Sequence, residues 1–65
     1  MRSAPEQVEI ACEVRAETEK AYLIYDGAKT VWVPKSQITD ESLNFAGRPE
    51  SIFIPVWLAK DKGLI

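Results

Sequence analysis

Few residues of this sequence could act as acids, bases, nucleophiles or metal ligands. The chain has no histidine, which is the commonest general base and metal ligand near neutral pH. Its one thiol, Cys12, cannot form a thiolate metal site alone, and its place in an alternating run indicates a buried, small apolar residue. Glu9, Glu13 and Glu17 fall on one face of the same predicted strand. Two of them could perform acid–base chemistry, but a solvated face explains them more simply.

The pair Lys35-Ser36 has a nucleophile beside a base, but the sequence supplies no third group to orient it. We therefore interpret the pair as turn residues. The three glycines are scattered and form no phosphate-binding loop. We predict that the protein is not an enzyme and has no catalytic residue, no metal site and no cofactor.

Length and composition predict one small domain. A chain of 65 residues buries only about 60% of its unfolded surface, so its stability is marginal. Eight Lys and Arg oppose ten Asp and Glu, which disfavours binding to duplex DNA. The start of the chain does not resemble a secretory signal, and no run approaches the roughly 18 apolar residues of a membrane helix. With a single unpaired cysteine, these features predict a soluble, cytoplasmic protein.

We expect a flexible N-terminus over residues 1–6 and a single domain over residues 7–65. The first ordered element of that domain is a strand. The stretch "VEIACEVRAE" alternates apolar and polar residues over ten positions, which predicts a strand with one buried face. It is long for a strand, so we expect a bend or bulge within it. The residues expected to point inward are Val8, Ile10, Cys12, Val14 and Ala16.

A hairpin is predicted next. Residues 21–25 and 30–33 are rich in β-branched and aromatic residues, and Asp26-Gly27 between them favours a tight turn. Pro34 has no N–H to donate and should end the second strand. Residues 35–37 should form a short link, after which Ile38 re-enters the core.

The remaining residues predict a second hairpin and a helix. Leu43 and Phe45 fit a short strand, residues 47–49 a turn and residues 51–54 a second strand, although a mostly irregular loop is the alternative. Residues 55–62 should form a helix that begins at proline, ends before a left-handed glycine and docks through Trp57 and Leu58.

The predicted fold class is therefore mainly β: a strongly bent antiparallel sheet or a small barrel of four or five strands, with a short C-terminal helix. The stretch "VWVPKSQI" resembles the strand, tight turn and strand near the end of Src-homology-3-like barrels. That resemblance implies the barrel alternative.

A second resemblance covers more than half of the chain. Its residues are Lys20, Ala21, Trp32, Pro34 to Gln37, Ile54, Pro55, Trp57 to Ala59 and Lys62 to Leu64. This pattern is similar to that of a group of small bacterial and prophage-borne proteins. It implies a phage or prophage origin without implying a mechanism. The segment over residues 39–51 looks longer than is usual in that group, so we expect a surface there to be peculiar to this chain.

The predicted hairpin also suggests a binding surface. If Val31 and Val33 point inward with Leu23, then Tyr22, Trp32 and Ile24 point outward together. Such a cluster must be covered, either by the C-terminal helix through Trp57 and Leu58, by a loop, or by a partner molecule or a second copy.

Two functions from different classes follow. The first is a protein-interaction module that binds a host or phage protein, or a second copy, through the aromatic cluster. Its orientation would be set by the charged outer face of Glu9, Glu13, Arg15 and Glu17. The alternative is a single-strand nucleic-acid binder in which bases stack on Tyr22 and Trp32. The residues near this platform that could contact phosphates are Lys20, Lys29 and Lys35. The acidic composition favours the first.

Overall fold

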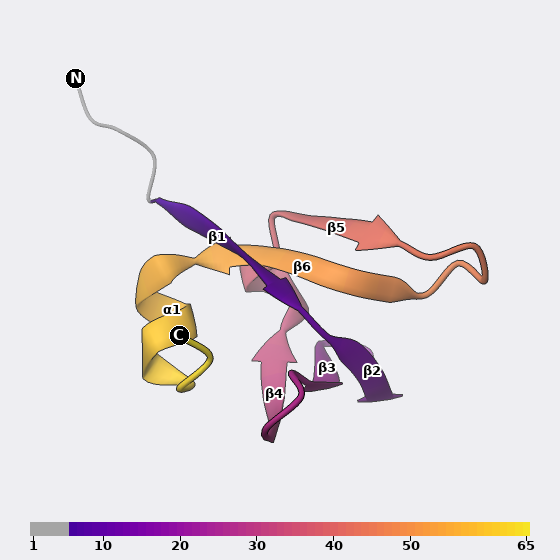
Figure 1. Ribbon diagram of the computed structural model, residues 1–65, viewed down its shortest axis with the longest axis horizontal. Helices are drawn as coiled ribbons and strands as arrows, with labels where there is room; N and C mark the ends of the chain where they lie inside the picture. Colours follow the sequence, from indigo (N-terminus) through magenta and orange to yellow (C-terminus); the bar gives the residue numbers. More distant parts are fainter. Residues whose placement is uncertain (1–5) are drawn as a thin grey trace.

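The computed structural model describes residues 6–65 and shows six strands in two antiparallel sheets, with one short C-terminal helix (Figure 1). The first sheet has the order β1 (Gln7–Ala11), β6 (Pro49–Pro55), β5 (Asp40–Leu43). The second has the order β2 (Glu13–Glu17), β3 (Ala21–Tyr25), β4 (Thr30–Pro34). The mainly β architecture with a C-terminal helix is confirmed. The expected four or five strands were too few, and neither sheet closes into a barrel among the described residues.

The strand count rises because the first alternating stretch breaks at Cys12. The N-terminal half, β1, pairs with β6, and the C-terminal half, β2, pairs with β3 in the other sheet. The backbone N–H of Cys12 donates to the carbonyl of Glu50 at 3.1 Å, and a register irregularity follows between Val14 and Ala16. The expected bend is therefore present. It turns one long strand into a member of both sheets.

The β3–β4 hairpin closes through a side-chain cap. Asp26 Oδ1 accepts the backbone N–H groups of Ala28 and Lys29, both at 2.8 Å, and Gly27 takes a φ of 101°. These bonds replace the partners that a tight turn leaves unpaired. After Pro34 the chain makes a single 3₁₀ turn, η1 (Lys35–Gln37), so the predicted hairpin and link are both confirmed.

The β5–β6 hairpin is also confirmed, with a different division between strand and turn. Phe45 lies in the turn, where its side chain is fully exposed, and not in the strand predicted for it. Asn44 Oδ1 accepts the N–H groups of Ala46 and Arg48 at 2.9 and 3.1 Å. This cap ends β5 at Leu43, because it commits the next five residues to the turn.

The helix α1 (Val56–Asp61) is one residue shorter at each end than predicted, with Pro55 and Lys62 as its caps. Its C-terminus has the predicted left-handed glycine: Gly63 donates to the carbonyl of Lys60, and Leu64 donates to that of Ala59. These are the two bonds of a Schellman motif.

The helix docks through Leu58 and Ala59, which are buried among the core residues. The prediction that Trp57 takes part in docking is wrong, because its side chain is 57% exposed. With only six residues, the helix has room for one apolar stripe, and that stripe runs through positions 58 and 59.

The core lies between the inner faces of the two sheets and the helix. Its buried apolar residues are Ile10, Ile24, Val33, Ile52, Ile54, Leu58 and Ala59. Ile38 packs against this cluster, as predicted from its position after the link. The carbonyl of Glu6 accepts the N–H of Val56 at 2.9 Å, while the rest of the expected flexible N-terminus lies outside the described residues. None of the helices in residues 6–65 is long and apolar enough to cross a membrane.

Candidate interaction surface

The expected cluster of Tyr22, Ile24 and Trp32 on one outward face is wrong. In the β3–β4 register, Ile24 lies opposite Val31, and Trp32 lies opposite Leu23. Residues directly opposite each other share a face of the sheet, so the valines face the core with Ile24, which is fully buried. The prediction paired the valines with Leu23, and this one-residue difference exchanges the two faces.

The true outer face of the β2–β3–β4 sheet is apolar. Its middle row runs across the three strands as Ala16, Leu23 and Trp32. We call the surface around this row the Trp32 face; its apolar members are Ala16, Ala21, Leu23, Tyr25, Trp32 and Pro34. Trp32 is 44% exposed. An antiparallel sheet with one face in water normally carries polar residues there, so this composition is unusual for a surface without a partner.

One end of the Trp32 face carries both signs of charge. The Arg15 guanidinium lies over the ring of Tyr25, 4.7 Å from its centroid, and also pairs with the Glu13 carboxylate at 3.2 Å. Glu13 lies opposite Tyr25 in the ladder, and the irregularity in β2 brings Arg15 beside it. Arg15 and Glu13 therefore rim an aromatic surface, as the sequence predicted for part of the charged outer face.

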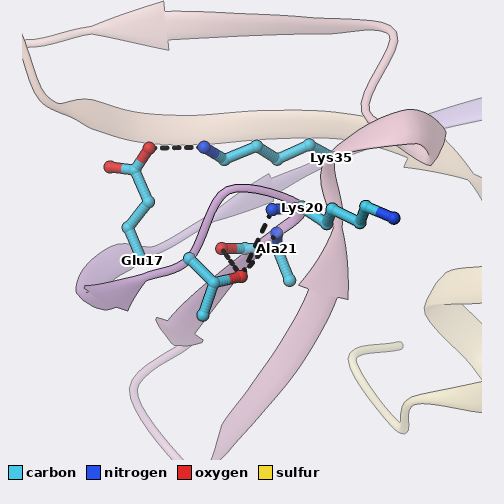
Figure 2. Close-up of polar contacts among 5 residues, drawn as sticks. Glu17, Lys20, Ala21 and Lys35 are labelled. Atoms are coloured by element: carbon cyan, nitrogen blue, oxygen red, sulfur yellow. Dashed lines mark hydrogen bonds and ion pairs between the residues drawn. The ribbon is translucent and has the colours of Figure 1, made fainter.

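Tyr22 and Lys35 belong to the opposite side of the sheet, which faces the core. The Lys35 ammonium pairs with the Glu17 carboxylate (Figure 2). It also lies 4.8 Å from the centroid of the Tyr22 ring. The hydrogen bond to Glu17 is the main reason that the pKa of Lys35 is raised. Burial, followed by the charges of Glu41 and Glu17, raises the pKa of the Tyr22 phenol.

Lys20 lies next to Lys35 but on the turn between β2 and β3. Its carbonyl accepts the N–H of Lys35 at 2.7 Å. Its own N–H donates to Thr18 Oγ1 at 3.3 Å, one of the dashed bonds beside Lys20 in Figure 2. The two lysines border an open hollow with Pro34 and Ser36. The sequence prediction is therefore correct in bringing Lys20 and Lys35 together, but not in placing them around a platform of Tyr22 and Trp32.

Trp57 is separate from both groups. Its helix packs mainly against β6 and β1, which belong to the other sheet. The exposed fractions of Trp57 and Trp32, 57% and 44%, show that the helix does not enclose either ring. Of the covers expected for an outward Trp32, the C-terminal helix is thus excluded.

A groove between the edge of β2 and the β5–β6 turn was not predicted. It has a volume of about 360 Å³ and is lined by Val14 to Glu17, Tyr22 and Gly47 to Pro49. Arg15 and Arg48 come from its two walls. The sequence offered one signal, since the segment over residues 39–51 was expected to form a surface of its own.

Cys12 is half-buried beneath the bend between β1 and β2. Burial is the main reason that the pKa of its thiol is raised, and the nearby Glu41 carboxylate raises it further. Both effects disfavour the reactive thiolate. This environment suits the predicted structural role of Cys12 and does not suit a nucleophile.

Comparison with known proteins gives no match: no family model, no curated protein and no solved structure is significantly similar to the chain.

Proposed function

We propose that the protein is a non-enzymatic interaction module that binds another protein through the Trp32 face. The observation that carries this proposal is the apolar row Ala16, Leu23 and Trp32 on the solvent side of a sheet whose other side already forms the core. Water contact with this row is unfavourable, and its burial against a partner would remove that cost.

The composition of the surface fits a binding site. Tyr and Trp dominate interface hot spots, and Tyr25 and Trp32 lie on the same face. Arg15 and Glu13 at its rim can orient a charged partner without needing to be buried. The resemblance to small prophage-borne proteins makes a host or phage protein, or a second copy, the partner that we propose. The same resemblance is our reason to propose a cytoplasmic phage accessory protein.

We further propose that the two sheets are an opened variant of the Src-homology-3-like barrel. The support is the turn over residues 34–37, where Pro34 ends one strand and η1 directs the chain into the other sheet. Strands β4 and β5 each lie at the edge of one sheet, and pairing between them would close the two sheets into such a barrel.

Single-strand nucleic-acid binding loses its geometric basis. Tyr22 and Trp32 lie on opposite faces of the sheet and cannot form one stacking platform. Lys35 is engaged by Glu17, which reduces its availability to a phosphate. We therefore do not propose this function.

The proposal is tested by capture from a bacterial lysate on immobilised protein. Trp32→Ala should lose a protein that the wild type retains, and Trp57→Ala should retain it. Trp57 is the matched control because it is an exposed tryptophan on the helix that packs against the other sheet. Circular dichroism should show that both variants are folded. Equal retention by Trp32→Ala would contradict the assignment of this face.

A further inference from the structure

We propose that the groove between β2 and the β5–β6 turn binds an extended peptide in which acidic and apolar residues alternate. The peptide would pair with the free edge of β2, and its carboxylates would contact Arg15 and Arg48. This inference goes beyond the proposed function, because it assigns a second site that does not depend on the Trp32 face.

The groove exists because two strands diverge. β1 pairs with β6 as far as Ala11, which lies opposite Ser51, and the Cys12 N–H then donates to the carbonyl of Glu50. Beyond this bond the chain leaves β6 and enters the second sheet as β2 (Figure 1). Among residues 6–65, β2 therefore pairs with β3 on one edge and with no strand on the other.

The lining residues show that the groove follows this edge of β2. Four consecutive residues of the strand, Val14 to Glu17, line it. Successive side chains of a strand point to opposite faces of the sheet, so a hollow lined by four in a row runs along the strand's edge. Four residues of strand measure about 13 Å, which is the length of an extended segment of about four residues.

The edge determines the conformation of the occupant. An outermost strand presents backbone N–H and C=O groups that point away from its one neighbour. An extended peptide satisfies these groups by adding one more strand to the sheet. Pro49 on the opposite wall has no N–H, so β2 is the side of the groove that offers a regular ladder.

The charges determine which side chains the occupant carries. Arg15 and Arg48 come from opposite walls, and Glu17 is the one carboxylate among the lining residues. Glu17 already pairs with Lys35, and Arg15 already pairs with Glu13. Arg48 has no ion pair within the part of the chain that the structure describes. A carboxylate of the peptide would give Arg48 its partner and would balance the excess positive charge of the lining.

The inner side of the groove favours apolar residues between the acidic ones. Val14 lies opposite the buried Ile24, and Tyr22 lies opposite the buried Val33, so both face inward. Arg15 lies on the outer side, against a ring of the Trp32 face. A strand added beside β2 points its side chains alternately to these two sides, which predicts the alternation of the peptide.

A second copy of the chain fits this edge less well. Two β2 strands paired antiparallel over their full length would place Arg15 opposite Arg15 and Glu13 opposite Glu17. Like charges directly opposite each other destabilise a sheet. A separate peptide is therefore the occupant that we propose.

Titration of isotope-labelled protein with a short, blocked peptide of alternating glutamate and valine tests the site. The NMR signals of the amides of residues 13–17 and 47–48 should move together, with a dissociation constant on the order of 1 mM. The same peptide with lysine in place of glutamate should bind about fivefold more weakly. A glutamate peptide methylated at every backbone nitrogen should not bind, because it cannot donate to β2. Equal binding of either control peptide, or no shift up to about 10 mM, overturns the inference.

A charge reversal on the far wall tests the role of Arg48. Arg48→Glu should weaken the glutamate peptide about tenfold and make the lysine peptide the better ligand. Lys60→Glu is the matched control, because it makes the same change of charge on the exposed end of α1, which packs against the other sheet. It should bind like the wild type. Both positions are exposed, so both variants should fold, as circular dichroism can verify. An Arg48→Glu variant that keeps the wild-type preference overturns the inference.

Two further measurements separate this site from other occupants and from the Trp32 face. Shifts of the amides of residues 13–17 with protein concentration alone would identify a second copy on the edge and overturn the inference. Trp32→Ala should bind the peptide like the wild type, and loss of binding there would place the peptide on the Trp32 face instead. Failure of the peptide to bind leaves capture through Trp32, and with it the proposed function, unaffected.

Discussion

Trp32 on β4 lies directly opposite Leu23 on β3, on the side of the sheet that faces away from the core. One position along, Ile24 lies opposite Val31 and is fully buried. Ile24 and Trp32 thus have opposite environments, although they belong to adjacent residue pairs of one hairpin, while Leu23 and Val31 are both partly buried. Substitutions in the two pairs should therefore have very different effects.

We expect Trp32→Ala to lower the free energy of unfolding by only about 1 kcal/mol, since the ring is partly covered but not enclosed. Ile24→Ala should lower it by about 2–5 kcal/mol, because it leaves a cavity in the core. Urea unfolding, followed by circular dichroism at a concentration low enough to keep the wild type monomeric, measures both. A loss of several kcal/mol in Trp32→Ala would mean that Trp32 is a core residue and would remove the basis of the Trp32 face.

The hairpin turn should make stability depend on pH in acid. Hydrogen bonds from the backbone N–H groups of Lys29 and Ala28 lower the pKa of Asp26 below its usual value of 3.8. A depressed carboxyl pKa contributes stability above the unfolded value, and this contribution is lost as the pH falls through the folded one. Asp26→Asn keeps the side-chain acceptor but cannot titrate. Its urea midpoint should therefore fall less steeply between about pH 5 and pH 2 than that of the wild type. Parallel curves would show that Asp26 is not the titrating group.

The thiol of Cys12 should react slowly. Burial and the Glu41 carboxylate both raise its pKa, so little thiolate is present near neutral pH. We expect a disulfide reagent at pH 8 to modify native protein more slowly than urea-unfolded protein, with the rate followed by absorbance. Glu41→Gln should increase the native rate modestly, because burial is the larger cause and remains. A native rate equal to the unfolded rate would contradict this environment.

The sequence predicted the local elements well because their signals are local. Alternation from Val8 to Val14 identifies the extended stretch of β1 and β2, Asp26-Gly27 the turn of the β3–β4 hairpin, and Gly63-Leu64 the helix stop. Each depends on residues a few positions apart. Ala16 was predicted to point inward, but the irregularity after Val14 turns it to the outer face beside Leu23. The separation of the strands into two sheets depends on β6 pairing with β1, 40 to 48 residues earlier, and no local pattern encodes that choice.

The candidate surface was misassigned for a different reason. Both faces of the β3–β4 hairpin are apolar, so hydrophobicity alone does not say which one is buried. The turn decides which face is buried. The backbone N–H of Asp26 donates to the carbonyl of Lys29, and this bond fixes Ile24 opposite Val31. The length of the turn therefore places Trp32 opposite Leu23.

The end of the helix gives a prediction with a built-in control. Gly63 has a φ of 73°, a backbone conformation that residues with a side chain adopt at a cost of about 1–2 kcal/mol. A Cβ at this position would also lie 2.6 Å from Lys29 Nζ, the atom that donates to the Gly63 carbonyl at 2.7 Å. Gly63→Ala should therefore be destabilising, and two causes compete.

Substituting Lys29 separates the two causes. The end of a lysine side chain is flexible and can move aside at little cost, whereas the backbone strain cannot be relieved. We expect Gly63→Ala to lower the free energy of unfolding by about 1–2 kcal/mol in the wild type and by the same amount in Lys29→Ala. Gly63→Asn should cost less, because asparagine tolerates the left-handed region. If the cost of Gly63→Ala disappears in Lys29→Ala, displacement of the lysine is its cause, and the left-handed backbone is not.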